Sequence, residues 1–308
     1  MVMAGYFADD SMAVRVMSKR AVGFTYGLRA LVVGAANPRL YVGTSNHTEH
    51  RATPYNRLAI TGRLFEAVFL GTKDEADRAL EFTRRKHAKV VGVLDEPAGT
   101  HCPAGTPYSA LDPHLMYMTM AFTFDSVEAM HDLLVRPLRP AEREALWQDF
   151  VSWGELFGMP RSAAPASYRQ FRSSFDAYLD SDELFLTDEA KLVGAYLSGS
   201  KRPGLPVQPW PAQQVLSLVV QGSLPPRIRH MYGLRWTPVH EAAFRSAVRA
   251  VRSAHARPLH GLPAPLRPLL HGTSSVGYQQ AARLERNHLR HGRPSMPGVS
   301  PVSPLVRR

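Results

Sequence analysis

The sequence has only one cysteine, Cys102, among its 308 residues, so an internal disulfide and a cysteine-based zinc finger are excluded. It also has no long hydrophobic run. Its two most apolar stretches, residues 30–36 and 115–124, are far shorter than the roughly 20 residues that cross a membrane. Residues 1–10 hold two aspartates and lack the basic and apolar segments of a signal peptide. Together these absences predict a cytoplasmic protein that folds without disulfides.

Acidic residues are scarce in the last third of the chain. Residues 201–308 contain 16 lysines and arginines against 2 aspartates and glutamates, a balance of +14, while residues 1–200 contain 21 against 24, a balance of −3. Such a segment indicates an anionic partner, or else a surface that uses arginine as its ordinary charge. An anionic membrane is the candidate partner, through a helix-patterned segment with Arg245, Arg249 and Arg252 at helical spacing. No helix-turn-helix or RNA-binding signature accompanies the charge, so nucleic acid is not predicted.

Signature motifs of several enzyme classes are missing as well. The chain has no Gly-rich phosphate loop, no dinucleotide-binding unit, no His-Glu-x-x-His and no Gly-x-Ser-x-Gly. Its 13 histidines are scattered along the chain. Kinase, hydrolase and zinc-enzyme functions therefore have no support in the sequence.

What the sequence does have is helical periodicity along most of its length. No alternating run is long enough to form a sheet, and no internal repeat is present. Helix-start signals stand at Thr72 with Glu75 and at Asp112, the latter before a Met-rich run that is apolar all round and therefore central. The sequence predicts one all-α domain over residues 5–270, followed by a disordered, basic, Ser/Pro/Arg-rich tail over residues 271–308.

The candidate site begins with two basic side chains on one predicted helix. Arg84 and His87 are three residues apart, and a helical turn places them on the same side as Ala76, Leu80 and Val91. Burying a cation and an imidazole is costly unless an anionic ligand, or a cofactor with carboxylates and a metal, pairs with them. The competing interpretation is structural: a core histidine bonded to a carbonyl, beside an arginine whose head group reaches solvent.

Several short motifs follow one another along the chain. They are Tyr26-Gly27-Leu28-Arg29, Arg57-Leu58 with Thr61, Arg84-x-x-His87-x-x-Val90-x-Gly92, Tyr108-Ser109-Ala110-Leu111-Asp112-Pro113, Pro137-Leu138-x-Pro140-x-Glu142-Arg143, Leu224-Pro225-Pro226 and Tyr232-Gly233-Leu234. In this order and spacing they resemble the MpaB-type oxygenase family, which includes the bacterial rubber oxygenases, or latex-clearing proteins. The resemblance covers most of residues 10–270.

The resemblance implies a globin-like helical fold that holds haem b. It also implies an oxygenase that uses dioxygen on a hydrophobic substrate such as a lipid or an isoprenoid. By position, Arg84 corresponds to the family's distal arginine and His87 to the polar side chain one turn later. An arginine there stabilises negative charge that develops on oxygen, and an imidazole ligates iron or carries a proton.

One position departs from the family. The register of its proximal histidine, the haem iron ligand, falls on Met120. Methionine also ligates haem iron, so the alternative ligand sets are His87 with Met120 opposite, His87 alone, or His114 after a change of register. Otherwise Met120 is core filler, and the chain is a degenerate, non-catalytic helical protein that binds an apolar ligand without haem.

Overall fold

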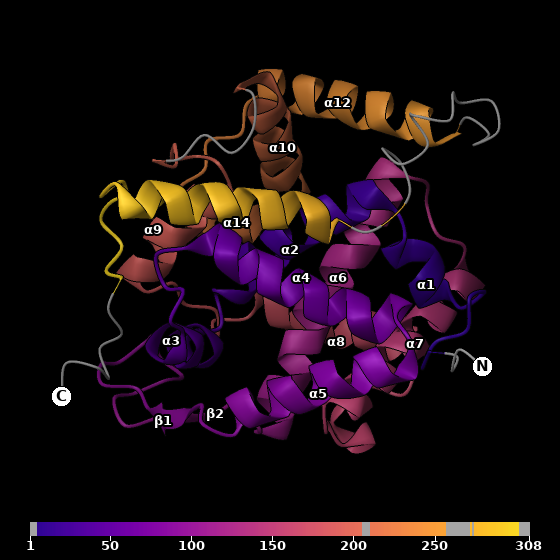
Figure 1. Cartoon of the computed structure of the whole chain (residues 1–308), viewed down its shortest axis with the longest axis horizontal. Helices are drawn as coiled ribbons and strands as arrows, with labels where there is room; N and C mark the ends of the chain where they lie inside the picture. The colour runs from indigo at the N-terminus through magenta and orange to yellow at the C-terminus, as the bar shows by residue number, and fades with distance from the viewer. Residues whose placement is uncertain (1–4, 205–209, 257–271, 273, 302–308) are drawn as a thin grey trace.

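The computed structural model describes residues 5–204, 210–256, 272 and 274–301. Over these residues the only regular elements besides helices are two short strands, which confirms the all-α class (Figure 1). No helix in the described part of the chain has both the length and the hydrophobicity needed to cross a bilayer. The elements are α1 (Met12–Met17), α2 (Arg20–Gly34), α3 (Pro38–His47), α4 (Pro54–Leu70), α5 (Lys73–His87), β1 (Val91–Val93), β2 (Pro107–Ser109), α6 (Pro113–Leu134), α7 (Pro140–Leu156), the 3-10 helix η1 (Arg161–Ala163), α8 (Tyr168–Asp180), α9 (Asp188–Leu197), α10 (Trp210–Ser223), α11 (Pro226–Met231), α12 (Pro238–Ala256) and α14 (Ser275–Arg290).

Helix α6 is the central helix of the fold, as its apolar sequence predicted. It begins where the sequence placed its cap: the Asp112 carboxylate accepts a hydrogen bond of 3.0 Å from the backbone N–H of Leu115. Pro113 occupies the first helical position, where a missing N–H costs nothing. Helices α2 and α7 both pack against α6, and most of its side chains are buried.

Helix α5 also begins as predicted. The Thr72 hydroxyl accepts from the N–H of Glu75, and the Glu75 carboxylate accepts from the N–H of Thr72, which forms a capping box. The helix ends at His87, and the β1–β2 ribbon then carries the chain toward α6. In the ribbon Gly92 lies opposite Tyr108, and a Cβ at Gly92 would come within 2.6 Å of the Tyr108 hydroxyl oxygen, so a larger residue does not fit there.

Helix α4 packs against α5 on one flank and against α14 on the other (Figure 1). Tyr278 and Ala282 of α14 join Leu58 and Ala59 of α4 in one hydrophobic cluster. Hydrogen bonds reinforce the contact, because Glu285 accepts from both the backbone N–H and the side-chain amide of Asn56, at 2.7 and 2.8 Å.

The presence of α14 corrects the prediction of a disordered tail over residues 271–308. Residues 275–290 form a helix, since Tyr278, Ala281, Ala282 and Glu285 recur at helical spacing and are buried. The arginines and histidines between them masked this pattern in the sequence. Residues 271, 273 and 302–308 of the predicted tail lie outside the described residues.

The C-terminal half of α6 carries buried carboxylates with arginine partners. Asp125 pairs with Arg29 of α2 at 2.6 Å and with Arg172 of α8 at 2.7 Å. One turn further on, Glu128 pairs with Arg143 of α7. Burial alone would raise the pKa of Asp125, but the two arginines hold it below its ordinary value. Ion-paired side chains therefore fill the space around this half of the helix, residues 125–134, which is here called the closed half of α6.

Candidate functional site

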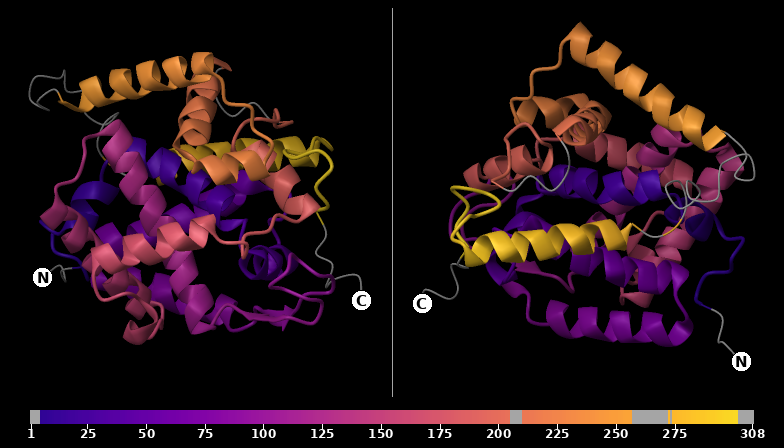
Figure 2. Two further views of the ribbon diagram at one scale, coloured as in Figure 1. Left: turned by 180° about the vertical axis from the view of Figure 1, so that it is seen from behind. Right: turned by 45° about the horizontal axis from the view of Figure 1, so that its top comes forward.

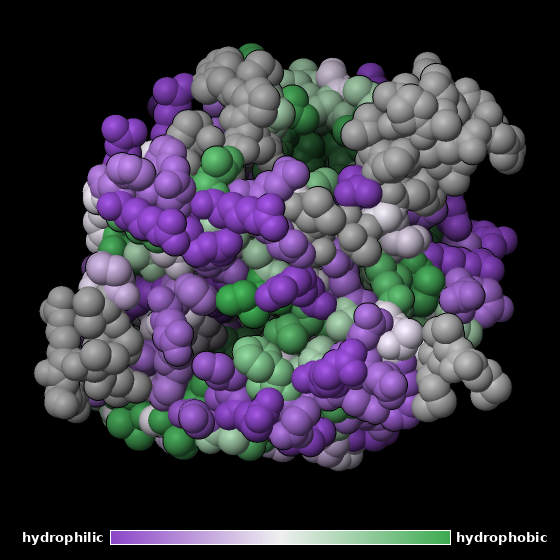
Figure 3. Space-filling view, in the orientation of Figure 1, coloured by the Kyte–Doolittle hydropathy of each residue, from purple (hydrophilic) through white to green (hydrophobic). Residues whose placement is uncertain are grey.

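Helices α2, α4, α5 and α6 line a cavity of about 340 Å³, here called the main cavity. Its walls are mostly apolar and include Phe65, Phe69 and Trp153. Thr61 on α4 and Thr119 in the middle of α6 line this cavity and are nevertheless exposed, which shows that the space is open. The space-filling view shows a hollow with hydrophobic walls between α3 and α5 (Figure 3). A volume of this size suits a small molecule or a cofactor.

His87 lies in the last turn of α5 and lines the main cavity together with Met120 of α6. The structure thus brings together two of the three residues that the sequence singled out. The His87 ring is half-buried and makes no hydrogen bond or ion pair within the described residues. Burial lowers the pKa of His87 below its ordinary value, so the ring is uncharged at neutral pH and keeps a nitrogen lone pair for a ligand.

Arg84, the third of these residues, faces solvent. Its side chain is 60% exposed and pairs with Glu81 of the same helix at 2.8 Å. The inward position in this turn belongs to the buried Thr83, whose hydroxyl donates to the carbonyl of Ala79. Successive helical residues are rotated by about 100°, so a stripe that passes through Thr83 leaves Arg84 outside. The expectation that Arg84 lies on the buried stripe is therefore wrong.

Met120 is buried, with 1% of its surface exposed, and its sulfur packs within the cavity wall. A Cβ placed on Gly154 of α7 would lie 3.2 Å from the Met120 sulfur and 2.7 Å from the terminal methyl of Met159. The two methionines thus fill the space over Gly154. His114, the alternative ligand, is exposed near the start of α6 and lies outside the described lining of the main cavity.

Arg57 is a site residue that the sequence argument missed. It lies on α4 beside the buried Leu58, and its side chain lines the main cavity. Burial lowers the pKa of Arg57 below its ordinary value, while the nearby Tyr41 opposes this shift. In the part of the chain that the structure describes, the guanidinium has no hydrogen bond or ion pair. The only sequence signal was the family-like motif Arg57-Leu58 with Thr61, which does not show the face that the arginine takes.

The indole N–H of Trp153 on α7 is a second polar group without a partner in the same lining. This donor is buried and bonds to no described residue, while its ring packs against Phe65 and Phe69 at centroid distances of 4.8 and 5.7 Å. Buried donors in folded proteins are nearly always hydrogen-bonded. Two donors without a described partner, the Arg57 guanidinium and the Trp153 indole N–H, thus belong to residues that line the main cavity.

Within the described ranges, no group of three or more histidine, cysteine, aspartate or glutamate side chains is arranged to hold a metal ion. Cys102 is a free thiol in a separate hydrophobic cluster with Tyr108 and Leu115, and burial raises its pKa. The lining of the main cavity contains several metal-capable side chains: His87, Met120, Glu66, Met17, Met116 and Met159.

The structure is thus a helical fold with a mostly apolar cavity between α2, α4, α5 and α6. Residues 14–253 match the family described as "ER-bound oxygenase mpaB/B'/Rubber oxygenase, catalytic domain". The chain belongs to this family, which confirms the resemblance drawn from its motifs, and membership suggests an oxygenase.

Two mycobacterial proteins are similar to the chain. They are the uncharacterized protein Rv2237 of Mycobacterium tuberculosis and the uncharacterized protein Mb2261 of Mycobacterium bovis. Each is 26% identical over 205 residues, which is 65% of this chain and 74% of the relative. No solved structure gives a significant match, so the globin-like arrangement stays a prediction.

Proposed function

We propose that the chain is a haem b-dependent oxygenase that acts on a hydrophobic substrate, with haem and substrate in the main cavity. Membership of an oxygenase family supports the reaction class. The observation that supports haem as the cofactor is the position of His87 in the wall of a cavity of about 340 Å³. Burial lowers the pKa of this imidazole, which favours its neutral form, and the ring has no partner among the described residues. Such a ring is available to a metal.

The residues of the main cavity fit a haem. Haem iron takes one or two ligands from the protein, and imidazole and thioether are both among them. His87 of α5 and Met120 of α6 would supply one of each. Gly62 leaves the wall of α4 open for a flat group, since a Cβ at this position would meet no atom within 4 Å. When bound, haem supplies the iron chemistry that activates dioxygen.

The chain's own side chains would bind and orient the substrate. The apolar walls exclude water and hold hydrocarbon, which is the main source of affinity for such a molecule. Arg57 contributes a fixed positive charge in a poorly solvated place, so negative charge on a bound molecule is favoured near α4.

A second candidate function is the binding of an apolar ligand without haem. The observation in its favour is the packing of the Met120 sulfur over Gly154 beside Met159, where the thioether acts as core filler. Under this alternative the chain keeps the family scaffold and the cavity but has lost the iron. The two candidates differ in whether a porphyrin is present, and one set of spectra separates them.

The test is an absorption spectrum of the purified full chain produced with a supply of haem, together with iron quantification. We expect a Soret band whose position or intensity changes in His87→Ala and stays the same in His114→Ala, because His114 is exposed and outside the cavity lining. Met120→His should strengthen haem binding by adding an imidazole from α6. A colourless wild-type protein that ignores added haemin would sink the cofactor proposal and favour the haem-free candidate.

An anionic membrane surface is the second partner that we propose, through α12. The helix stands at the edge of the molecule (Figure 2). Arg245 and Arg249 are exposed, whereas Arg252 donates to the backbone carbonyls of Leu133 and Asp132 at 3.1 and 2.6 Å. Vesicles rich in phosphatidylserine should bind the protein at low salt and release it at high salt. Absence of binding at low ionic strength would contradict this contact.

A further inference from the structure

A smaller cavity of about 180 Å³ adjoins the main cavity and is here called the mouth cavity. The two cavities share seven lining residues, which come from α2, α3, α4 and α6. They are Ala30, Leu31, Leu40, Thr44, Arg57, Thr119 and Thr123. Arg57 is the only one of the seven with a charged side chain. Arg57 is therefore the charged residue at the junction of the two cavities.

Neighbouring arginines differ from Arg57 in having partners. Arg51, which also lines the mouth cavity, forms an ion pair with Glu189, and Arg286 donates to the side-chain carbonyl of Asn56 at 2.5 Å. Arg57 has neither a carboxylate nor a carbonyl partner in the described ranges of the chain. Arg57 is half-buried, and partial desolvation of a cation without a counter-ion favours a bound anion at the junction.

The hydroxyl groups beside Arg57 differ in what they offer an anion. Thr119 and Thr123 donate their protons to the carbonyls of Leu115 and Thr119, at 2.9 and 2.8 Å. The Thr44 hydroxyl on α3 makes no such bond to the described residues, so its proton is available. A planar guanidinium with a hydroxyl nearby is a donor set that suits a carboxylate, which it can bind through two parallel N–H groups.

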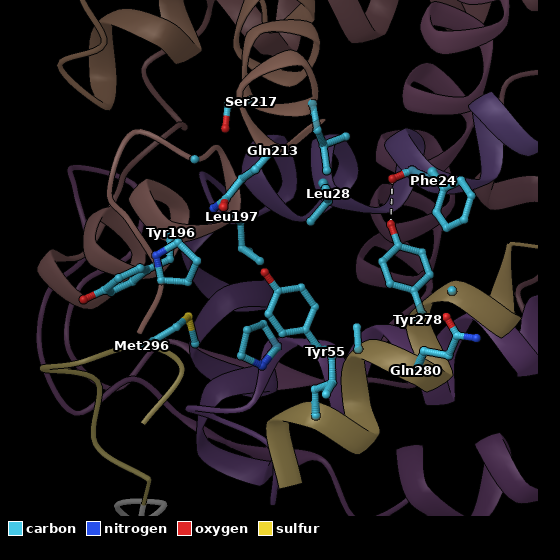
Figure 4. Close-up of a pocket in the computed structure, with 17 residues that line it drawn as sticks. Phe24, Leu28, Tyr55, Tyr196, Leu197, Gln213, Ser217, Tyr278, Gln280 and Met296 are labelled. Carbon is cyan, nitrogen blue, oxygen red and sulfur yellow. Dashed lines mark hydrogen bonds between the residues drawn. The ribbon is translucent and has the colours of Figure 1, made fainter. Parts of the chain in front are cut away.

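An apolar chain attached to this carboxylate has two cavities to choose from. A third cavity of about 240 Å³, the side cavity, lies between α2, α4, α10 and α14, where Tyr55, Gln213, Ser217 and Gln280 add polar atoms (Figure 4). The mouth cavity shares with it only Pro54, Leu197 and Met296 among its lining residues. The main cavity is larger, and it meets the mouth cavity at Arg57 itself. An acyl chain bonded to a carboxylate at Arg57 thus extends into the main cavity.

We infer that the junction binds the carboxylate of a long-chain amphiphilic acid, with Arg57 and Thr44 as donors and the acyl chain in the main cavity beside His87. As a statement about substrate class, this inference rests on the proposed oxygenase function. As a statement about binding, it holds for the protein with or without haem, and binding is what the experiment measures.

The test is isothermal titration of the full chain with dodecanoate, with methyl dodecanoate and with dodecanol. The wild-type protein should bind the acid at least tenfold more tightly than the ester. Arg57→Gln should weaken acid binding by about tenfold to a hundredfold and leave ester binding unchanged, which is the range for a hydrogen bond to a charged group. Arg84→Gln is the matched control, since it removes an exposed arginine of the same charge and should change neither affinity.

Equal binding of acid and ester by the wild-type protein, or equal weakening of both by Arg57→Gln, would overturn the inference. Arg57→Met and Thr44→Val cover the case in which Arg57→Gln does not fold. Both keep the packing of the junction approximately, so a reduced preference for the acid in these variants supports the inference and an unchanged preference overturns it.

Haem also carries carboxylates, so a further experiment distinguishes a haem carboxylate at Arg57 from the carboxylate of a fatty acid. The protein is titrated with haemin and with haem dimethyl ester while the Soret band is followed. If Arg57→Gln weakens haemin binding alone and dodecanoate does not bind the wild type, then the carboxylate belongs to the cofactor and the inference is overturned. A colourless protein that binds dodecanoate through Arg57 supports the inference and removes only the haem proposal.

Discussion

The arginines around the two halves of helix α6 differ in whether they have a counter-ion. In the C-terminal half, Asp125 forms ion pairs with both Arg29 and Arg172, and these side chains fill the space beside the helix. In the N-terminal half, Thr119 faces an open cavity, where Arg57 has no counter-ion among the described residues. Residue type is therefore a poor guide to role in this fold. Pairing separates an arginine that stabilises the core from one that is available to a ligand.

The largest effect should come from breaking the closed half. Asp125→Ala leaves Arg29 and Arg172 without their shared carboxylate, and loss of one partner from a buried ion pair costs about 3–5 kcal/mol. Urea unfolding should therefore give a much lower free energy of unfolding. Arg57→Gln removes a charge that is already unpaired and should cost far less. Equal costs for the two variants would erase the distinction between the two halves.

The pH dependence of stability should carry a signature of His131, a 3% exposed residue of the closed half. Burial, and then the charge of Arg136, lower its pKa from 6.5 to about 4. Between pH 4 and pH 6.5 the His131 ring is therefore protonated in the unfolded chain and unprotonated in the folded chain. The contribution is therefore present above pH 6.5 and is lost as the pH falls toward 4, by about 3 kcal/mol in total.

Urea unfolding at several pH values measures this contribution as the difference between wild type and His131→Leu. The variant should lose less stability than the wild type between pH 6.5 and pH 4. His101→Asn is the control, because the His101 side chain is 50% exposed. Parallel pH profiles for wild type and His131→Leu would show that His131 takes up its proton without loss of the fold.

Two glycines test which walls of the main cavity are open. Gly154→Ala would place a methyl group 2.7 Å from the end of the Met159 side chain and 3.2 Å from the Met120 sulfur, so both side chains must shift and the variant should be less stable than Gly62→Ala. Gly62→Ala places the same methyl group in open space and should stabilise the helix by about 0.5–1 kcal/mol. Thermal unfolding compares the pair. A loss of stability in Gly62→Ala would mean that the wall of α4 is already filled.

The smallest effect is expected at Arg84. Its ion pair with Glu81 is exposed on both sides, and such pairs contribute little. Arg84→Gln should change the free energy of unfolding by less than about 0.5 kcal/mol and leave the absorption spectrum unchanged. A loss of haem binding or of activity in this variant would show that Arg84 belongs to the functional site.

Local signals made part of the fold predictable from the sequence. The capping box at Thr72 and Glu75 and the cap at Asp112 act within three residues of each other, so the starts of α5 and α6 can be read without any tertiary information. The face that α5 buries was less certain. Its pattern of Ala76, Ala79 and Leu80 is compatible with either Thr83 or Arg84 as the next inward residue, and packing against α4 decides for Thr83.

Counter-ions are not a local property, and for this reason the candidate site was only half predicted. Arg29 and Arg57 both lie on apolar helices in the sequence, yet Arg29 meets a carboxylate 96 residues away and Arg57 meets none in the described structure. Helical spacing pointed to His87 and the family register pointed to Met120, and the structure brings both to one cavity. Arg57 emerges only when the partners of every arginine are known.

Helix α14 has a practical consequence for work with shortened proteins. The family match stops at residue 253, and a fragment trimmed to that limit lacks the helix that shields the back of α4. Leu58 and Ala59 would then meet water, and Asn56 would lose its carboxylate acceptor. Such a fragment is expected to aggregate and to lose the shape of the main cavity. Crystallisation and ligand screening should therefore use protein that extends at least to residue 301.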